Sequence, residues 1–345
     1  MRNQSQFILN TVGRRAFNFI TKHVHLNPRT AVLATNTMIN IEGLLPTDEL
    51  INLKRINDFK DINAYFKEVN KKLPYGGLFV NYVETYSVRK HRILKKYPKP
   101  INWIYYCLDV FLTRITPKLK MTSKLYYYLS GGKGRVLSGT EILGRLLYCG
   151  FQILEKAEIN NQMYFVAEKV QEPQFVVHNP NYGFLIKLPR VAKDGKVINV
   201  YKFRTMHAYS EYIQDYVYQQ NDLAKGGKLN NDFRISSLGA FFRKYWLDEL
   251  PMFINLCKGE IKIVGVRPLS KHYMSLYNND LKKLRTLSKP GLLPPFYADM
   301  PETIDEIQAS EERYLKAYLK SPFKTDVRYF FKIIHTIVIR GKRSA

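Results

Sequence analysis

Acidic residues are scarce in this sequence. Its 345 residues hold 29 Asp and Glu against 54 Lys and Arg, so the formal net charge at pH 7 is +25. Such an imbalance disfavours a cationic partner and indicates an anionic one, which could be nucleic acid, a phosphorylated substrate or an anionic membrane face. The hydrophobic content of 46% is ordinary, and the length allows two domains with cores of their own.

Cysteines are also few. The three present, Cys107, Cys149 and Cys257, are widely separated. An odd number at such spacings excludes a disulfide framework and the paired spacing of a zinc site. We therefore expect a reducing, cytoplasmic environment.

Long apolar runs are missing as well. A spanning helix needs roughly 20 predominantly apolar residues. The two best stretches are each interrupted by a charge, Ile101–Thr113 by Asp109 and Tyr329–Ile339 by Lys332. Early basic residues similarly argue against a secretory signal. We expect no transmembrane span, and a protein that lies on a membrane at most.

The first 170 residues alternate between helical and strand patterns, which predicts an α/β domain. Helical spacing runs through Leu50–Asn70, and Leu78–Thr85 alternates like a strand. A short helix over Glu141–Gly150 precedes a hairpin that turns at Asn160-Asn161. Residues 171–181 contain two prolines and are predicted to be a linker. This gives three segments: a domain over 1–170, a linker over 171–181 and a domain over 182–345.

Residues 37–170 loosely resemble the C-terminal half of a class I methyltransferase-like domain. The resemblance rests on the turn Leu73–Gly77 into a strand, the helix with Glu141–Leu146, the segment Cys149–Phe151 and the closing hairpin. Such domains bind their cofactor at a glycine-rich turn after the first strand, and residues 1–50 contain no such turn. The resemblance therefore implies a degenerate domain with a structural or docking role.

Two motifs in the second half have the composition of a phosphate site. A hairpin over Gly183–Pro189 and Lys196–Arg204, which turns at Lys193-Asp194-Gly195, ends in Lys-x-Arg. Alternation along a strand puts Lys202 and Arg204 on one face. Paired cations of this kind can clamp a phosphate, although a solvated strand face is the plainer alternative. Further on, Asp248-Glu249 precede Pro251, which suits the first turn of a helix. Asp248 is then the expected N-cap, held ionised by the helix dipole, and the plain alternative is that it only caps.

With these motifs, residues 182–345 resemble the bacterial sugar transferases, the monotopic phosphoglycosyl transferases that start polysaccharide assembly on a polyprenyl phosphate. The blocks occur in the family's order: Tyr201–Met206; Asn231–Ile235; Leu238-Gly239 with Phe242–Lys244; Leu247–Pro251 with Asn255 and Lys258-Gly259; Val264–Pro268; and Lys289–Leu292. The expected architecture is a mixed α+β transferase domain with surface amphipathic helices.

The resemblance implies an activity and a site. Asp248 would attack a nucleotide diphospho-sugar, and the phosphosugar would pass through an aspartyl intermediate to polyprenyl phosphate, with Glu249 assisting. Mg²⁺ held by Asp248 and Glu249, together with cations, would neutralise the diphosphate. The candidate phosphate-binding residues are Lys202, Arg204, Arg234, Arg243 and Arg267. For Arg234 the alternative is an ion pair with Asp232.

The sequence departs from the family pattern in three places. The re-entrant membrane helix that normally precedes Gly183 is replaced by the polar, hairpin-like stretch Gln152–Asn181, Tyr245-Trp246 stand where small residues are usual, and Val266 replaces a proline. Membrane contact must then come from surface helices. Either the stripe along 326–340 or the aromatic stripe at 101–116 could lie in the headgroup layer. Core packing is equally open for 326–340, and it is the expected arrangement for 101–116, in the core of the first domain.

Two other functions remain open. A catalytically silent scaffold of a polysaccharide-assembly complex would explain the absent membrane helix, but the intact Asp248-Glu249 pair favours an enzyme. Nucleic-acid binding rests on charge alone, since no basic stripe alternates with aromatics, and no nucleic-acid partner is expected. The expected partners are a nucleotide diphospho-sugar, polyprenyl phosphate and the inner face of the cytoplasmic membrane. The sequence leaves the oligomeric state and the identity of the sugar open.

Overall fold

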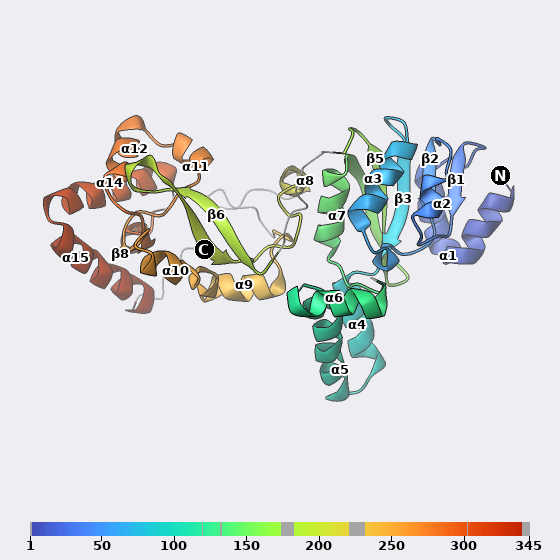
Figure 1. Cartoon of the computed structure of the whole chain (residues 1–345), viewed down its shortest axis with the longest axis horizontal. Helices are drawn as coiled ribbons and strands as arrows, with labels where there is room; N and C mark the ends of the chain where they lie inside the picture. The colour runs from blue at the N-terminus through green and yellow to red at the C-terminus, as the bar shows by residue number, and fades with distance from the viewer. Residues whose placement is uncertain are drawn as a thin grey trace. The chain divides into compact units, whose positions relative to one another are not determined.

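A computed structural model describes residues 2–118, 120–131, 133–173, 183–220, 232–301 and 303–339. The chain forms two compact units (Figure 1). The first unit combines Met1–Asn181 with His207–Gln219, and the second combines Tyr182–Met206 with Gln220–Ala345. The return of His207–Gln219 to the first unit was not predicted. Most of the predicted linker, from residue 174 onwards, lies outside the described residues.

The first unit is built on a five-stranded sheet in the order β1-β2-β3-β5-β4. Its strands are β1 (Thr30–Leu33), β2 (Glu49–Asn52), β3 (Leu78–Val83), β4 (Phe151–Ile159) and β5 (Gln162–Lys169). Strands β1, β2 and β3 are parallel, whereas β5 runs antiparallel to β3 and to β4. Asn160 and Asn161 both take positive φ angles, 51° and 58°, as a two-residue hairpin turn requires. The predicted hairpin is confirmed.

Helices cover both faces of this sheet. On one face α1 (Arg2–His23) packs Ile20 against Val80 and Val166. Because alternate residues of a strand point to opposite sides, the neighbouring Phe79 points the other way, and its ring meets Phe66 of α3 at 5.9 Å between centroids. The remaining elements on these layers are α2 (Ile39–Glu42), η1 (Ile56–Asp58), α3 (Ile62–Lys72) and α7 (Gly139–Tyr148). The mixed α/β class is confirmed.

The helix predicted over Leu50–Asn70 is wrong at its start. Residues 50–52 belong to the buried strand β2, and the helix itself begins only at Ile62, capped by the Asp61 side chain. A buried parallel strand is a short apolar run, and its residues happen to continue the helical spacing that follows. Periodicity alone therefore could not separate the two elements.

The stretch between β3 and α7 forms a helical lobe, residues 86–133. It contains α4 (Tyr86–Lys96), α5 (Ile101–Val110), the π-turn η2 (Phe111–Ile115), η3 (Thr116–Lys118) and α6 (Lys120–Ser130). The aromatic stripe at 101–116 was expected in the core, and this expectation is wrong. On α5 only Asn102 is buried, and the large apolar side chains are exposed.

The segment that returns to the first unit is held by Tyr209. Its ring lies under the Arg145 guanidinium at 4.3 Å, and its hydroxyl accepts a hydrogen bond of 2.6 Å from the Asn63 amide. Gly144 of α7 permits this approach, because a Cβ there would lie 2.2 Å from the Tyr209 carbonyl oxygen. The segment continues into α8 (Gln214–Gln220).

The second unit begins with the predicted hairpin, β6 (Leu185–Val191) and β7 (Val197–Phe203), which turns through η4 (Lys193–Gly195). A parallel pair, β8 (Lys262–Val264) and β9 (Gly291–Leu293), anchors the rest. The helices are α9 (Ser237–Lys244), η5 (Leu247–Glu249), α10 (Met252–Cys257), α11 (Lys271–Ser275), α12 (Asn279–Thr286), α13 (Phe296–Asp299), α14 (Ile304–Lys320), α15 (Pro322–Ile334) and η6 (His335–Ile339).

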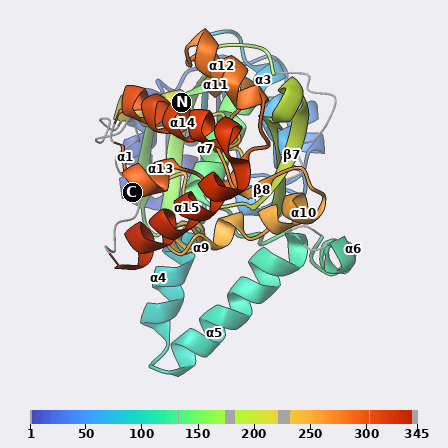
Figure 2. The ribbon, with the colours of Figure 1, turned by 90° about the vertical axis from the view of Figure 1, so that its left-hand side faces the viewer.

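The core of this unit lies where α14 and α15 pack beside β8. Tyr314 and Leu315 of α14 and Ile333 of α15 enclose Val264 of β8, and Figure 2 shows the two helices side by side. Val327, Phe331 and Ile334 of α15 remain exposed. The basic residues at 340–343, which belonged to the predicted membrane stripe, lie outside the described residues. Among the helices described, none is long and apolar enough to cross a bilayer.

Candidate functional site

Asp248 and Glu249 lie on η5, a single 3-10 turn between α9 and α10. Trp246 precedes the turn in the left-handed conformation (φ 54°, ψ 19°), which is unusual for a bulky residue. The chain reverses there, and the Glu249 amide donates to the Trp246 carbonyl at 3.1 Å. Helix α10 begins only at Met252, after Pro251. The prediction that Asp248 is the N-cap of a helix is therefore wrong.

The two carboxylates have different surroundings. Glu249 forms a hydrogen-bonded ion pair with Lys202 of β7. Asp248 is half-buried, and this burial raises its pKa above the ordinary aspartate value; Lys202 and Arg243 oppose the rise, while Glu249 adds to it. The structure thus brings Lys202, Arg243, Asp248 and Glu249 close together. Of the two acids, Glu249 forms the direct ion pair with a lysine, whereas Lys202 and Arg243 act on Asp248 through their charge.

Arg243 connects the two carboxylates, Asp248 and Glu249, to a second pair, Arg234 with Asp232. Its Nε donates to Thr205 Oγ1 at 2.9 Å, at the end of β7. Its guanidinium also lies within electrostatic reach of Asp248, Asp232 and Arg267. Arg243 is thus the residue that links the carboxylates to the other basic side chains.

Arg234 is buried and forms a two-bond ion pair with Asp232. Its Nε and one terminal nitrogen each donate to a different carboxylate oxygen, both at 2.8 Å. Burial by itself would raise the pKa of Asp232, but the hydrogen bonds from Arg234 outweigh it and lower the pKa. The alternative considered for Arg234, an ion pair with Asp232, is what the structure shows.

Arg204 is held through both its backbone and its side chain, and Arg267 through its backbone. The Arg204 amide donates to the Phe184 carbonyl at 2.7 Å, and its Nε donates to the Gly183 carbonyl at 3.0 Å. The Arg267 side chain is exposed, while its carbonyl accepts a hydrogen bond from the buried Arg285. Of these two, Arg267 has the guanidinium that faces solvent, and it lies near Arg243.

Asn255 is a structural residue of the site to which the sequence assigned no role. It is fully buried, and its Oδ1 accepts from the Tyr201 amide at 3.0 Å. Its Nδ2 donates to the Asn199 carbonyl at 2.8 Å and to the Glu260 carboxylate at 2.6 Å. Asn255 thereby fastens α10 to β7, next to Lys202. A buried amide inside an apolar helical stretch was the available signal.

Two close approaches complete the site. Gly239 of α9 packs so closely on Thr205 that a Cβ at this position would lie 1.9 Å from the Thr205 carbonyl oxygen. Trp246 contacts Tyr297, with 5.5 Å between ring centroids. Tyr297 follows Pro294-Pro295, so this loop lies beside Trp246, two residues before Asp248.

The carboxylates offer oxygen donors suited to a hard cation. Within the described residues no group of three or more His, Cys, Asp and Glu side chains could hold a metal by itself. Mg²⁺ rarely needs one, since it is usually bound by one or two carboxylates, by water and by substrate phosphates. Asp248 and Glu249 therefore fit a Mg²⁺ that arrives with a phosphorylated substrate.

A carboxylate pair beside clustered cations, on a small α+β scaffold, defines a class of protein that handles anionic, phosphate-bearing substrates. Residues 175–340 match the family model of the bacterial sugar transferases. This part of the chain belongs to that family, whose members are transferase enzymes. Within it, His207–Gln219 is the segment that packs on the first unit.

Named relatives agree with this assignment. The chain is 38% identical over 104 residues to the galactosyl transferase CpsE of Streptococcus agalactiae serotype III, covering 30% of this chain and 23% of the relative. It is 36% identical over 108 residues to the undecaprenyl-phosphate galactose phosphotransferase of Salmonella typhimurium, covering 30% and 22%. It is 34% identical over 110 residues to the UDP-glucose:undecaprenyl-phosphate glucose-1-phosphate transferase of Escherichia coli, covering 31% and 22%. The matches thus span less than a quarter of each of these relatives.

Proposed function

We propose that the second unit transfers a phosphosugar from a nucleotide diphospho-sugar to a polyprenyl phosphate. The observation that carries the proposal is the half-buried Asp248, with Lys202 and Arg243 close enough to act on its charge. The names of two relatives, which describe sugar-phosphate transfer to undecaprenyl phosphate, support the same chemistry. The product would begin a capsule, exopolysaccharide or O-antigen type glycan.

Asp248 is the proposed nucleophile. One carboxylate oxygen attacks the β-phosphorus, and the bond from this phosphorus to the bridging oxygen breaks. Nucleoside monophosphate leaves with the bridging oxygen, while the phosphosugar stays on Asp248 as an acyl phosphate. In the second step a phosphate oxygen of the polyprenyl phosphate attacks the same phosphorus, and the Asp248 carboxylate is released. Partial burial suits this role, because a poorly solvated carboxylate is a stronger nucleophile once it is ionised.

The basic residues would have different roles in neutralising charge at the site. Lys202 and Arg243 lie nearest to Asp248 and would offset the repulsion between carboxylate and diphosphate. The side chain of Arg267 is exposed, so it is the natural contact for the phosphate that lies farther from Asp248. Arg234 faces Asp232, so its larger contribution would be to position this part of the site. Arg204, whose Nε donates to the Gly183 carbonyl, is retained as a further proposed phosphate contact.

We propose Mg²⁺ as the cofactor, held by Asp248 and Glu249 together with substrate oxygens. When bound, it would neutralise charge that develops on the diphosphate. Glu249 would divide its two oxygens between the ion and Lys202, and it would orient the incoming phosphate of the lipid carrier.

A lipid-linked acceptor also agrees with the surface beside the carboxylates. Exposed apolar side chains flank η5 on α9, at Leu250 and on α10. They are Leu238, Phe241, Tyr245, Leu250, Phe253 and Ile254. Such a patch suits an isoprenoid chain or the edge of a bilayer. We therefore propose that the enzyme works peripherally, at the inner face of the cytoplasmic membrane.

The first unit would then serve structure or docking. The turn after β1 reads Ala34-Thr35-Asn36-Thr37 and holds no glycine, whereas a dinucleotide or S-adenosylmethionine site needs close backbone approach at this point. We propose that this unit is a degenerate methyltransferase-like domain that does not bind S-adenosylmethionine. Calorimetric titration with S-adenosylmethionine should show no heat of binding, and saturable binding would refute the proposal.

The activity test uses the full chain in detergent with undecaprenyl phosphate, Mg²⁺ and a panel of nucleotide sugars that includes UDP-galactose and UDP-glucose. Wild type should release nucleoside monophosphate, and donor labelled in the sugar should mark the protein when the acceptor is omitted. Asp248→Asn should lose both signals, whereas Asp280→Asn, an exposed aspartate on α12, should keep them. Release without any labelled protein would refute the covalent step. No turnover with any donor would favour the scaffold function.

A further inference from the structure

The lobe of residues 86–133 carries an amphipathic helix whose polar side faces the protein and whose apolar side faces solvent. On α5 the one buried side chain, Asn102, and the one charged side chain, Asp109, are both polar and both contact α4. Asn102 is buried and donates to the Leu94 carbonyl at 3.1 Å. Asp109 binds Arg89 of α4, and Thr113 donates to the Asp109 carbonyl at 2.7 Å. A helix that packed on a core would turn its apolar side inward.

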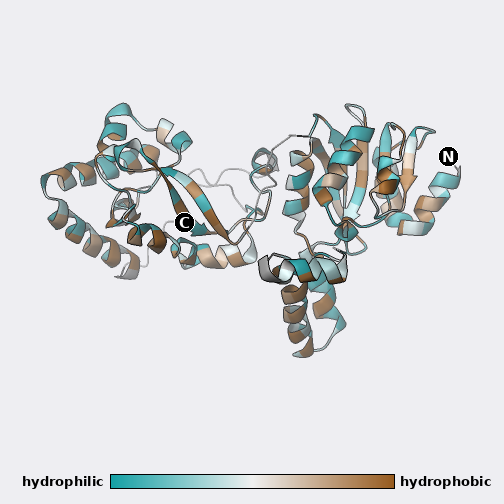
Figure 3. Ribbon diagram, viewed as in Figure 1, coloured by the Kyte–Doolittle hydropathy of each residue, from teal (hydrophilic) through white to brown (hydrophobic). Residues whose placement is uncertain are grey.

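Most of α5 is hydrophobic (Figure 3), and the large apolar side chains of α5 and η2 are exposed. These exposed side chains are Ile101, Trp103, Ile104, Tyr105, Leu108, Phe111, Leu112 and Ile115. Helix α6 adds Leu125, Tyr128 and Leu129, which are also exposed. Single exposed apolar residues need no explanation, but a contiguous set of this size marks an interaction surface.

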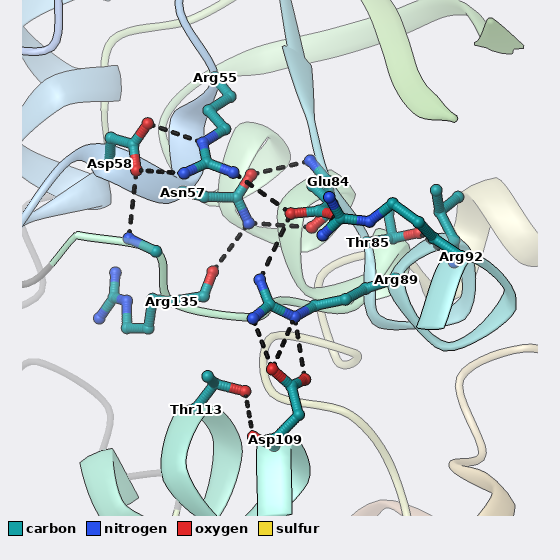
Figure 4. A network of polar contacts seen from close by, with 12 residues as sticks. Arg55, Asn57, Asp58, Glu84, Thr85, Arg89, Arg92, Asp109, Thr113 and Arg135 are labelled. Carbon is teal, nitrogen blue, oxygen red and sulfur yellow. Dashed lines mark hydrogen bonds and ion pairs between the residues drawn. The ribbon is translucent and has the colours of Figure 1, made fainter. Parts of the chain in front are cut away.

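An ion-pair network fixes this orientation (Figure 4). Glu84 follows β3 and is buried among three arginines, which approach its carboxylate at 3.3 Å (Arg55), 3.5 Å (Arg89) and 2.5 Å (Arg92). Arg89 also binds both oxygens of Asp109, with its Nε at 2.9 and 3.1 Å. Asp109 therefore ties the polar face of α5 to the end of the sheet. Turning the apolar face inward would take Asp109 away from Arg89, whose side chain is mostly buried, and removing one partner of a buried ion pair is costly.

The lobe is strongly basic. Residues 86–133 hold eleven Lys and Arg but a single acidic residue, Asp109, so they supply +10 of the formal +25. The one carboxylate is already paired with Arg89. Lys90 lies 5.4 Å from the Trp103 ring centroid, so the cations stand directly beside the apolar face. Lys95 and Lys96 at the end of α4 and Lys99 just before the N-terminus of α5 are exposed.

We propose that this lobe binds the surface of an anionic lipid bilayer, with α5 lying flat in the headgroup layer. An apolar face rimmed by lysines and arginines and containing Trp and Tyr is the composition of interfacial helices. The fifteen residues of α5 and η2 extend about 22 Å at 1.5 Å per residue, which is too short to span the hydrocarbon core. A protein partner would need a matching acidic rim, and a second copy would bring another +10 instead. The docking does not depend on the activity proposed above, since it concerns binding alone.

The test measures binding of the full chain to vesicles. Wild type should sediment with phosphatidylcholine vesicles that contain phosphatidylglycerol, and much less with phosphatidylcholine alone. Ile104→Glu with Leu108→Glu places two charges on the apolar face, at side chains that are 60% and 57% exposed, and should lower the partition coefficient about tenfold or more. The matched control is Ile39→Glu with Leu45→Glu, at side chains 78% and 82% exposed elsewhere on the same unit, and it should bind like wild type.

A second measurement localises the contact. The chain has two tryptophans, so Trp246→Phe leaves Trp103 as the only one. Its emission should shift to the blue when anionic vesicles are added, and brominated lipid should quench it. Equal vesicle binding by the Ile104→Glu, Leu108→Glu variant and wild type would overturn the proposal. The proposal would also be overturned if wild type were a dimer that this variant converts to a monomer without any change in lipid binding. A second copy of the chain would then cover the apolar face. Nucleoside monophosphate release in detergent reports on the catalytic proposal separately.

Discussion

Replacing Asn255 by alanine should destabilise the second unit more than any exposed substitution near the site. The side chain is fully buried and makes three hydrogen bonds, to the Tyr201 amide, the Asn199 carbonyl and the Glu260 carboxylate. Each is worth about 1 kcal/mol net, and burying the abandoned Tyr201 amide adds about 1–2 kcal/mol more. We therefore expect the free energy of unfolding to fall by about 4–5 kcal/mol, a large part of a typical domain's stability.

Urea unfolding of the full chain measures this change. In a Trp103→Phe background the fluorescence of Trp246 follows the second unit alone. Asn199→Ala is the matched control, because its side chain is exposed and its backbone carbonyl, the acceptor for Asn255, is retained. The control should change the free energy by less than about 0.5 kcal/mol.

A second substitution separates hydrogen bonding from packing. Asn255→Asp keeps nearly the same volume and an acceptor for the Tyr201 amide, but it turns acceptor oxygens toward the Asn199 carbonyl and the Glu260 carboxylate. It should destabilise at least as much as Asn255→Ala, because two acceptors repel and a buried charge is added. If Asn255→Asp were as stable as wild type, or if Asn255→Ala lay within about 0.5 kcal/mol of it, the clamp assigned to this side chain would be wrong.

Three further predictions concern the same site. Lys202→Met removes the nearest cation that holds down the pKa of Asp248, so the acidic limb of the rate–pH profile for nucleoside monophosphate release should move to higher pH; an unmoved limb would show that Lys202 does not act on the nucleophile. Asp248→Asn should raise the urea midpoint at neutral pH, since the raised pKa means that folding disfavours the ionised form. This gain should vanish below the ordinary aspartate pKa, where wild-type Asp248 is protonated in both states, and a gain that persisted there would have another cause. Gly239→Ala should cost about 1–3 kcal/mol in the same assay, because its Cβ would lie 1.9 Å from the Thr205 carbonyl oxygen; an unchanged midpoint would contradict this close packing.

Local turn chemistry made parts of the fold predictable. The hairpin at Asn160-Asn161 was found because asparagines tolerate positive φ angles, and both residues adopt them. The hairpin between β6 and β7 was found through Lys193-Asp194-Gly195, where Asp194 and Gly195 take φ angles of 57° and 70°. Since strand alternation then follows from the pairing, the placement of Lys202 toward the carboxylates followed too.

Features that depend on distant contacts could not be predicted. Nothing near Tyr209 in sequence shows that its ring will lie under Arg145, so the return of this segment to the first unit was missed. The same holds for α5: an aromatic stripe looks identical whether it faces a core or solvent. Its direction is decided by the ion pair of Asp109 with Arg89, which no local pattern reveals.

The largest difference concerns what controls the proposed nucleophile. A helix dipole would be a property of the local sequence, and it would lower the pKa of Asp248 whatever the rest of the chain did. In the structure the left-handed Trp246 prevents this arrangement, and burial raises the pKa instead. The opposing cations come from β7 and α9, so they act only if the two elements stay in register with η5. Arg243 is held by Thr205, and Lys202 follows the Tyr201 amide that Asn255 binds. The reactivity of Asp248 is therefore a property of the folded unit, and substitutions that never touch substrate should change it.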